Sequence, residues 1–140
     1  MINKSRKLYF FFARSITFNT FLESMAKRLR EEFHIILYSK DTEKIDTNKF
    51  QKKKIFIPLN FLDLINFKKL LATIITINQI TKNAKKNVIF CHTPAISHLV
   101  RIISFFNKPN IVYFVHGFRF NDSRNFIYNY FFKVIEIILS

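Results

Sequence analysis

The chain alternates short unbroken apolar runs with longer segments whose apolar residues recur at helical spacing. Unbroken runs are typical of strands buried on both faces of a parallel sheet, and strands that alternate with helices form such sheets with right-handed crossovers. The pattern therefore predicts an α/β fold: a Rossmann-like parallel sheet with helices on both faces. The expected strands are 8–13, 33–38, 54–57, 88–91 and 111–115.

Each expected helix follows a residue that can act as its N-cap. Thr20 and Glu23 fit a capping box, and Thr93 followed by Pro94 combines a cap residue with a proline at the first helical position. The expected helices cover 20–32, 61–81, 94–106 and a last segment that includes 126–138, with the other caps at Asn60 and at Asp122 or Ser123. The apolar set expected to face the core from 61–81 is Phe61, Leu64, Ile65, Phe67, Leu70, Leu71, Ile74 and Ile75.

The segment 39–54 is polar, charged and without periodicity, which predicts a long loop. It ends in a lysine cluster, Lys49 and Lys52 to Lys54, directly before the short strand expected at 54–57. We interpret the cluster as a solvated loop, with a patch for phospholipid head groups as the alternative.

Composition limits both the number of domains and the classes of function. At 140 residues with 49% apolar content, we expect a single domain over 1–140. The formal net charge of +14 predicts an anionic partner: nucleic acid, phospholipid or a phosphorylated substrate. The single cysteine, Cys91, allows no intrachain disulfide and is expected to be a small buried hydrophobe rather than a nucleophile. With only one glycine, the chain has neither a Walker motif nor G-x-G-x-x-G, which excludes a stand-alone NTPase or dehydrogenase.

Neither a signal peptide nor a membrane-spanning helix is expected. Arg14 ends the N-terminal apolar run too early for a signal peptide, and the longest uncharged stretch, 70–81, is too short and too polar to span a bilayer. We therefore expect a cytoplasmic protein, peripheral to the inner face of the cell membrane. The sequence stops inside an apolar helix, and we expect it to be truncated.

Two histidines follow apolar strands, where open α/β sheets bind their ligands. His92 comes after the strand at 88–91, and His116 comes after the strand at 111–115, beside Gly117 and Arg119. An imidazole can donate or accept a hydrogen bond to a sugar hydroxyl or a phosphate, and the amides of the helix after Thr93 can hold an anion. A buried core or capping histidine is the alternative interpretation of His92, and an ordinary turn glycine is the alternative for Gly117.

The combination His92-Thr93-Pro94, a strand, His116-Gly117-Phe118-Arg119-Phe120 and a helix with Tyr128, Ile135 and Glu136 resembles the N-terminal half of bacterial family 4 glycosyltransferases. The similar enzymes build capsule, exopolysaccharide or lipopolysaccharide. The resemblance implies a GT-B architecture, in which this N-terminal domain binds the acceptor and a C-terminal domain binds the nucleotide-sugar and transfers the sugar with retention of configuration.

The resemblance also implies roles for particular residues. His116 is the expected catalytic residue, because it would reach the donor sugar from the acceptor side. The expected substrate-binding residues are Ser15, Thr17 and Asn19 of the first loop, together with His92, Thr93, Gly117 and Arg119. No metal and no cofactor is expected, and the nucleotide-sugar acts as co-substrate. The expected partners are the nucleotide-sugar, a lipid-linked glycan acceptor and an anionic membrane surface, and for a split enzyme also a separate donor-binding subunit.

The sequence departs from the family in two respects. The first loop carries none of the glycines of many relatives, which puts its contact with donor phosphates in doubt, and the donor-binding domain with its paired glutamates is absent. We therefore expect this chain to transfer no sugar by itself, because a GT-B enzyme needs both walls of its cleft. A basic nucleic-acid-binding module and a peripheral membrane-binding module without catalysis are the alternatives, although no nucleic-acid-binding motif is present.

Overall fold

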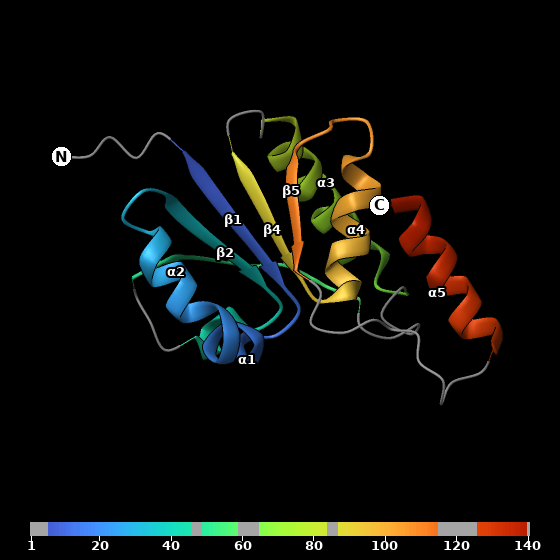
Figure 1. The fold of residues 1–140 in the computed structure, drawn as a ribbon, viewed down its shortest axis with the longest axis horizontal. Coiled ribbons are helices and arrows are strands. Elements are labelled where there is room, and N and C mark those ends of the chain that lie inside the picture. The colour runs from blue at the N-terminus through green and yellow to red at the C-terminus, as the bar shows by residue number, and fades with distance from the viewer. Residues whose placement is uncertain (1–5, 46–48, 59–64, 84–86, 115–125, 140) are drawn as a thin grey trace.

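A five-stranded parallel sheet forms the centre of the molecule in the computed structural model, which describes residues 6–45, 49–58, 65–83, 87–114 and 126–139 (Figure 1). Its strands are β1 (Lys7–Phe12), β2 (His34–Ser39), β3 (Gln51–Lys54), β4 (Val88–His92) and β5 (Asn110–Phe114). The spatial order is β3-β2-β1-β4-β5, and every neighbouring pair is parallel. This arrangement confirms the predicted Rossmann-like α/β fold.

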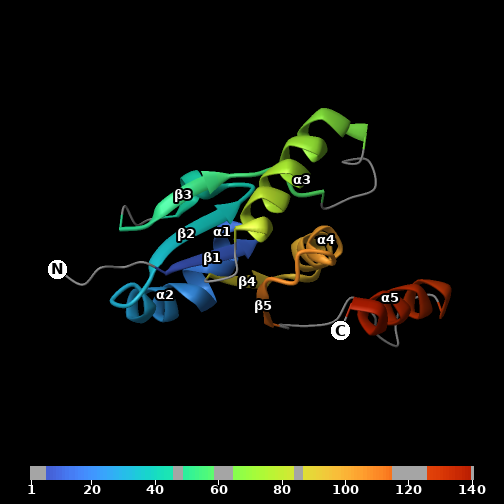
Figure 2. The same cartoon turned by 90° about the horizontal axis from the view of Figure 1, so that it is seen from above.

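Helices lie on both faces of the sheet (Figure 2). The helical segments are α1 (Ser15–Thr17), η1 (Phe18–Leu22), α2 (Glu23–Leu29), η2 (Thr42–Lys44), α3 (Phe67–Lys82), α4 (Pro94–Ser104) and α5 (Phe126–Leu139). The segment from α1 to α2 covers one face, α3 and α4 cover the other, and α5 lies beyond α4. No helix in the described part of the chain has the length and apolar character needed to cross a bilayer.

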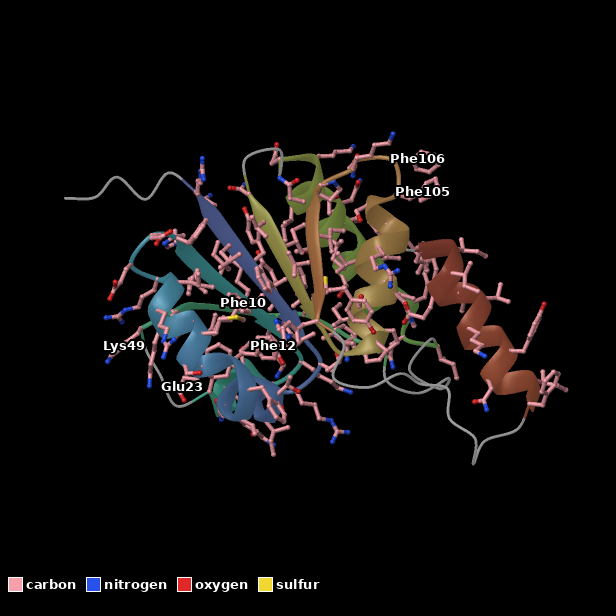
Figure 3. All side chains as sticks on the ribbon, viewed as in Figure 1. Phe10, Phe12, Glu23, Lys49, Phe105 and Phe106 are labelled. Carbon is pink, nitrogen blue, oxygen red and sulfur yellow. The ribbon has the colours of Figure 1, made fainter. Side chains whose placement is uncertain are left out.

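The central strand β1 is buried on both faces, which explains its unbroken apolar sequence. Phe10 and Phe12 point toward α2 and belong to one core cluster (Figure 3). Tyr9 and Phe11 belong to the cluster under α3 and α4 on the opposite face. A strand with two buried faces cannot alternate between apolar and polar residues, so the absence of alternation correctly predicts a parallel sheet.

The first helical segment begins earlier than predicted. It starts at Ser15 rather than after Thr20, and Thr20 lies inside η1, where it caps nothing. The predicted capping box is therefore wrong, and Ser15, Thr17 and Asn19, which were expected in the first loop, are helical. The helix can begin at Ser15 because Asp41, which is distant in sequence, accepts the Ser15 amide hydrogen.

The third strand is displaced from its predicted position. The lysine run itself forms β3, whereas Ile55 and Ile57 follow the strand as buried residues. Lysines suit this position because β3 is the edge of the sheet, and charged side chains on an edge strand oppose pairing with another chain. The segment interpreted as the end of a solvated loop is therefore a solvated edge strand.

The long helix α3 is shorter than predicted and presents a different face to the core. Ile65 and Asn66 are not α-helical, and Asn60 and residues 61–64 lie outside the described residues. The buried residues of α3 are Thr73, Ile77, Ile80 and Thr81, whereas Phe67, Leu71 and Ile75 of the predicted set are exposed. The polar residue Thr73 can be buried because its Oγ1 donates to the Phe56 carbonyl oxygen at 2.9 Å and accepts from the Phe56 amide at 3.1 Å.

The helix α4 begins at Pro94 as predicted and ends at Ser104, two residues before its predicted end. Pro94 occupies its first turn, and Ile96 and Val100 are fully buried against the sheet. The expected caps of the last helix, Asp122 and Ser123, lie outside the described residues.

A carboxylate on α5 joins that helix to α4 and β5. Glu136 Oε2 accepts from Arg101 at 2.8 Å, and Glu136 Oε1 lies 2.8 Å from His98 Nε2. Tyr113 donates weakly to the same carboxylate at 3.5 Å, and Arg101 stacks over the Tyr113 ring. Burial opposes the charge of Glu136, but hydrogen bonds and charges from Arg101 and His98 outweigh it and lower the pKa of that carboxyl. This cluster gives Glu136 a structural role.

Candidate functional site

The carboxyl ends of β1 and β4 lie side by side at the centre of the sheet. Phe12 pairs with His92, and each strand leads directly into a helix, α1 after β1 and α4 after β4. β2, which follows β1 in the sequence, lies on one side of β1, and β4 lies on the other side. This reversal of strand order is the switch point at which open α/β sheets bind ligands, beyond the carboxyl ends of their strands.

The helix that follows β1 has its first donors satisfied from within the chain. Asp41 lies just beyond β2, and its Oδ1 accepts the Ser15 amide at 2.7 Å while its Oδ2 accepts the Ser15 hydroxyl at 3.1 Å. Ser39 donates a further hydrogen bond to Asp41 at 3.1 Å. Ser15 is buried, with 5% of its surface exposed. The predicted substrate-binding residue Ser15 is thus engaged in a structural contact.

The Asp41 carboxylate is held in its charged form. Burial alone would raise its pKa, but hydrogen bonds from the Ser15 amide, from Ser39 and from the Ser15 hydroxyl, together with the charge of Lys44, lower the pKa below its usual value. A charged acceptor at the start of a helix also interacts favourably with the helix dipole. Asp41 therefore fixes the start of α1 to the end of β2.

The other two residues predicted in the first loop lie in the same helical segment. The Thr17 amide donates to the Arg14 carbonyl oxygen at 3.0 Å, as part of the first helical turn. Asn19 is exposed, and its side-chain amide donates to the Lys44 carbonyl oxygen at 3.2 Å. The Thr17 contact lies within the first helical segment, and the Asn19 contact joins that segment to η2. Asn19 remains accessible to solvent.

His92 is enclosed by aromatic rings at the end of β4. Its exposed fraction is 0%, and its ring stacks on Phe10 at 5.8 Å, on Phe90 at 6.0 Å and on Phe114 at 5.6 Å between centroids. This position agrees with the alternative interpretation of His92 as a core histidine. A ligand contact by His92 stays a prediction, and it would require the ring to leave this stack or the stack to open.

Thr93, by contrast, occupies a strained backbone position at the start of α4. Its φ is 85° and its ψ is 133°, a conformation that is unfavourable for a β-branched residue. Thr93 is the N-cap residue as predicted, but its side chain makes no capping hydrogen bond. Its Oγ1 is buried and has no hydrogen-bond partner among the described residues. Strain of this kind is concentrated at functional sites.

Ser97 adds a second unsatisfied hydroxyl one turn further along α4. It is fully buried at 0% exposure, and its Oγ has no hydrogen-bond partner in the described part of the chain. Its amide donates to the Thr93 carbonyl oxygen at 3.1 Å, which closes the first helical turn. The amides of Ala95 and Ile96, earlier in that turn, have no acceptor within the helix. The start of α4 therefore offers several hydrogen-bond donors and the positive end of a helix dipole.

Three predicted residues cannot be compared with the structure. His116, Gly117 and Arg119 lie outside the described residues, so their expected roles stay predictions. Burial raises the pKa of the Cys91 thiol, which keeps it protonated and agrees with a buried hydrophobe rather than a nucleophile. Within the described ranges, no three metal-ligating side chains come close enough together to hold an ion.

Sequence reasoning missed Asp41 and Ser97. Asp41 had a usable signal, because it follows the end of the second strand, whose carboxyl end lies beside that of the first. Ser97 had a weaker one: it lies four residues after Thr93 and hence on the same side of the helix. Neither signal predicts that Asp41 accepts hydrogen bonds from Ser15, or that the hydroxyls of Thr93 and Ser97 have no partner among the described residues.

The donors at the start of α4 can hold an anionic oxygen or sugar hydroxyls, and the buried hydroxyls of Thr93 and Ser97 would first have to become accessible. Comparison with known protein families, with curated proteins and with solved structures finds no match to this chain.

Proposed function

We propose that this chain binds the polar part of a lipid-linked glycan at the switch point between β1 and β4. In this proposal it is the acceptor-binding half of a retaining glycosyltransferase that acts on surface-polysaccharide precursors. The strand order β3-β2-β1-β4-β5 supports the location, because a ligand crevice is expected where that order reverses. The sequence resemblance to family 4 glycosyltransferases supports the choice of substrate.

The single observation that carries the proposal is the start of α4. Thr93 and Ser97 each bury a hydroxyl without a partner among the described residues, and the Thr93 backbone is strained. An unsatisfied buried hydroxyl costs about 1–3 kcal/mol. A pyrophosphate or sugar group that reached these buried hydroxyls would supply their missing partners, with the amides of Ala95 and Ile96 as further donors.

The remaining roles follow from the resemblance. His116 is proposed to reach the donor sugar, with Gly117 allowing close approach and Arg119 supplying positive charge. The nucleotide-sugar is proposed to be held by a separate donor-binding half, so that the chain by itself transfers no sugar.

A binding titration tests the acceptor site. A water-soluble polyprenyl-pyrophosphate glycan with a shortened lipid is titrated into the 140-residue chain by calorimetry. We expect Thr93→Val and Ser97→Ala each to weaken binding about tenfold, because one hydrogen bond to a charged group contributes about 1.5 kcal/mol. Ser104→Ala is the matched control, because the buried Ser104 hydroxyl on the same helix already donates to the Val100 carbonyl oxygen at 2.6 Å.

Two results would contradict the acceptor site: absence of binding to the parent chain, or equal weakening by Ser97→Ala and Ser104→Ala. The catalytic assignment is tested separately by His116→Ala in an enzyme with the donor-binding half restored. Unchanged turnover in that variant would contradict the role of His116 and leave the binding proposal standing.

A second candidate function, peripheral membrane binding, is favoured by exposed aromatic side chains. Phe105 and Phe106 follow α4 and project from the molecule with 62% and 90% of their surfaces exposed (Figure 3). Lys108 is exposed two residues later, and the whole chain carries +14. Exposed rings beside positive charge suit an anionic bilayer surface.

Vesicle sedimentation tests this candidate. We expect binding to vesicles with 30% phosphatidylglycerol and loss of most of that binding in Phe105→Ser/Phe106→Ser, because the rings supply the apolar contact. Equal binding of the parent chain to neutral phosphatidylcholine vesicles, or an unaffected double variant, would contradict it.

A further inference from the structure

A basic groove lies on the face of the sheet covered by α3, away from the start of α4. It has a volume of about 720 Å³ and lies between the first three strands and the C-terminal end of α3. Figure 2 shows α3 on the opposite side of β1 and β2 from α2. The volume falls within the range of about 300–1,000 Å³ that is typical of small-molecule sites.

Three lysines from separate elements line this groove. Lys7 begins β1, Lys53 lies in β3, and Lys82 ends α3. All three are exposed, and none forms an ion pair with a described residue. No carboxylate occurs among the described residues that line the groove. The positive charges are therefore not compensated locally.

Strand alternation explains why Lys53 differs from its neighbours. Lys52 donates to the Ile45 carbonyl oxygen at 3.2 Å, and Lys54 forms an ion pair with Glu43 at 3.2 Å. Lys53 points to the opposite face of β3, because successive side chains of a strand alternate. There it lies in register with Tyr38 of β2. The lysine run thus sends one charge into the groove and keeps its two neighbours in structural contacts.

Two tyrosines contribute further donors to the groove. Tyr9 and Tyr38 both line it, and their ring centroids lie 6.3 Å apart. Neither hydroxyl has a hydrogen-bond partner in the part of the chain that the structure describes. Burial raises the pKa of both phenols, that of Tyr38 to about 12, so both stay protonated near neutral pH and can donate.

We propose that this groove binds a compact phosphate-bearing ligand. Ammonium groups and phenol hydroxyls donate hydrogen bonds to phosphate oxygens, and lysines from three elements surround one multiply charged group. Lys82 in the last turn of α3 also offsets the partial negative charge of that helix end. The proposal is independent of the acceptor site, because it uses none of the residues at the start of α4.

The test uses inorganic pyrophosphate as the probe for a soluble phosphate ligand, titrated into the 140-residue chain by calorimetry. We expect Lys7→Gln/Lys53→Gln/Lys82→Gln to weaken binding more than about tenfold, because three charge-assisted contacts are lost. The control Lys68→Gln/Lys108→Gln/Lys133→Gln removes the same charge from exposed positions outside the groove and is expected to change affinity less than about threefold. Tyr38→Phe keeps the buried ring and is expected to weaken binding about threefold to tenfold.

A parallel titration with vesicles that contain phosphatidic acid distinguishes a lipid head group from a soluble ligand. Binding to the vesicles but not to pyrophosphate, with the same loss in the groove variant, would support the groove and identify the phosphate as lipid-borne. Equal weakening by the two triple variants would mean that only net charge matters and would overturn the proposal. Absence of binding to both probes, or an unaffected groove variant, would also overturn it.

Discussion

Two helices begin at the same edge of the sheet, and they begin in opposite ways. At the first helix, Asp41 accepts both the amide and the hydroxyl of Ser15. At α4, Thr93 has a positive φ, and the hydroxyls of Thr93 and Ser97 have no partner among the described residues. One helix start is completed by another part of the chain, whereas the other leaves donors available. This difference is the basis of the acceptor site proposed at the start of α4.

The two helix starts are also expected to contribute differently to the stability of the fold. Buried polar groups are almost always paired in native proteins, so an unpaired group calls for a reason such as a ligand. The Asp41 contacts are expected to stabilise the fold, and the open groups at α4 are expected to reduce its stability. Substitutions at the two helix starts should therefore change the free energy of unfolding in opposite directions.

The largest effect is expected at Asp41. Asp41→Ala removes the acceptor of the Ser15 amide and hydroxyl and leaves a buried amide unpaired, so the free energy of unfolding should fall by about 2–3 kcal/mol. Urea denaturation of the parent chain and the variant measures this difference. A loss below about 0.5 kcal/mol would place Asp41 among surface residues without structural effect.

The same carboxylate predicts a pH dependence. The pKa of Asp41 is lower in the folded state than its usual value, so its stabilisation is complete above that value and is lost as the pH falls through the folded-state pKa. Asp41→Asn should therefore flatten the decline in stability between about pH 5 and pH 2. An unchanged slope in urea denaturation across this range would contradict the assignment.

The next effect is expected at Thr93. Thr93→Gly removes a β-branched residue from a conformation that glycine adopts readily, and the free energy of unfolding should rise by about 1–2 kcal/mol. Thr93→Ser keeps the hydroxyl and most of the strain and serves as the control. If Thr93→Gly instead lowers the free energy of unfolding, the backbone conformation of Thr93 does not destabilise the folded chain.

A smaller effect with a matched pair is expected on α4. Ser97→Ala removes an unsatisfied buried hydroxyl and should stabilise the chain by about 1 kcal/mol, whereas Ser104→Ala removes a bonded one and should change stability by less than about 0.5 kcal/mol. Both substitutions carry the same change in helix propensity, so their difference reports the hydroxyl environment. Equal effects in thermal denaturation would mean that the Ser97 hydroxyl is paired in solution.

The smallest effect is expected at Asn19. Its side chain donates to the Lys44 carbonyl oxygen at an exposed position, so Asn19→Ala should cost less than about 0.5 kcal/mol. The denaturation midpoints of Asn19→Ala and Asp41→Ala are compared. A much larger decrease for Asp41→Ala would show that the start of α1 depends mainly on the Asp41 carboxylate. A comparable loss in both variants would show that the whole contact between η2 and the first helix is needed.

Local sequence patterns predicted the elements better than their contacts. Pro94 after Thr93 correctly marked the start of α4. Thr20 and Glu23 fitted a capping box, yet the helix begins at Ser15 because Asp41 is close in space. The pattern 61–81 gave a helix but the wrong buried face, since the contact between Thr73 and Phe56 depends on tertiary packing.

The Rossmann-like parallel sheet could be predicted from local patterns along the chain, because strands buried on both faces must be apolar throughout and helices must connect them. Which polar groups at the carboxyl edge have hydrogen-bond partners depends on how distant segments pack together. This packing brought Asp41 to Ser15, enclosed His92 among aromatic rings and left the hydroxyls of Thr93 and Ser97 without described partners. The physical reason is that periodicity depends on near neighbours in the chain, whereas hydrogen-bond satisfaction depends on residues that approach from distant segments.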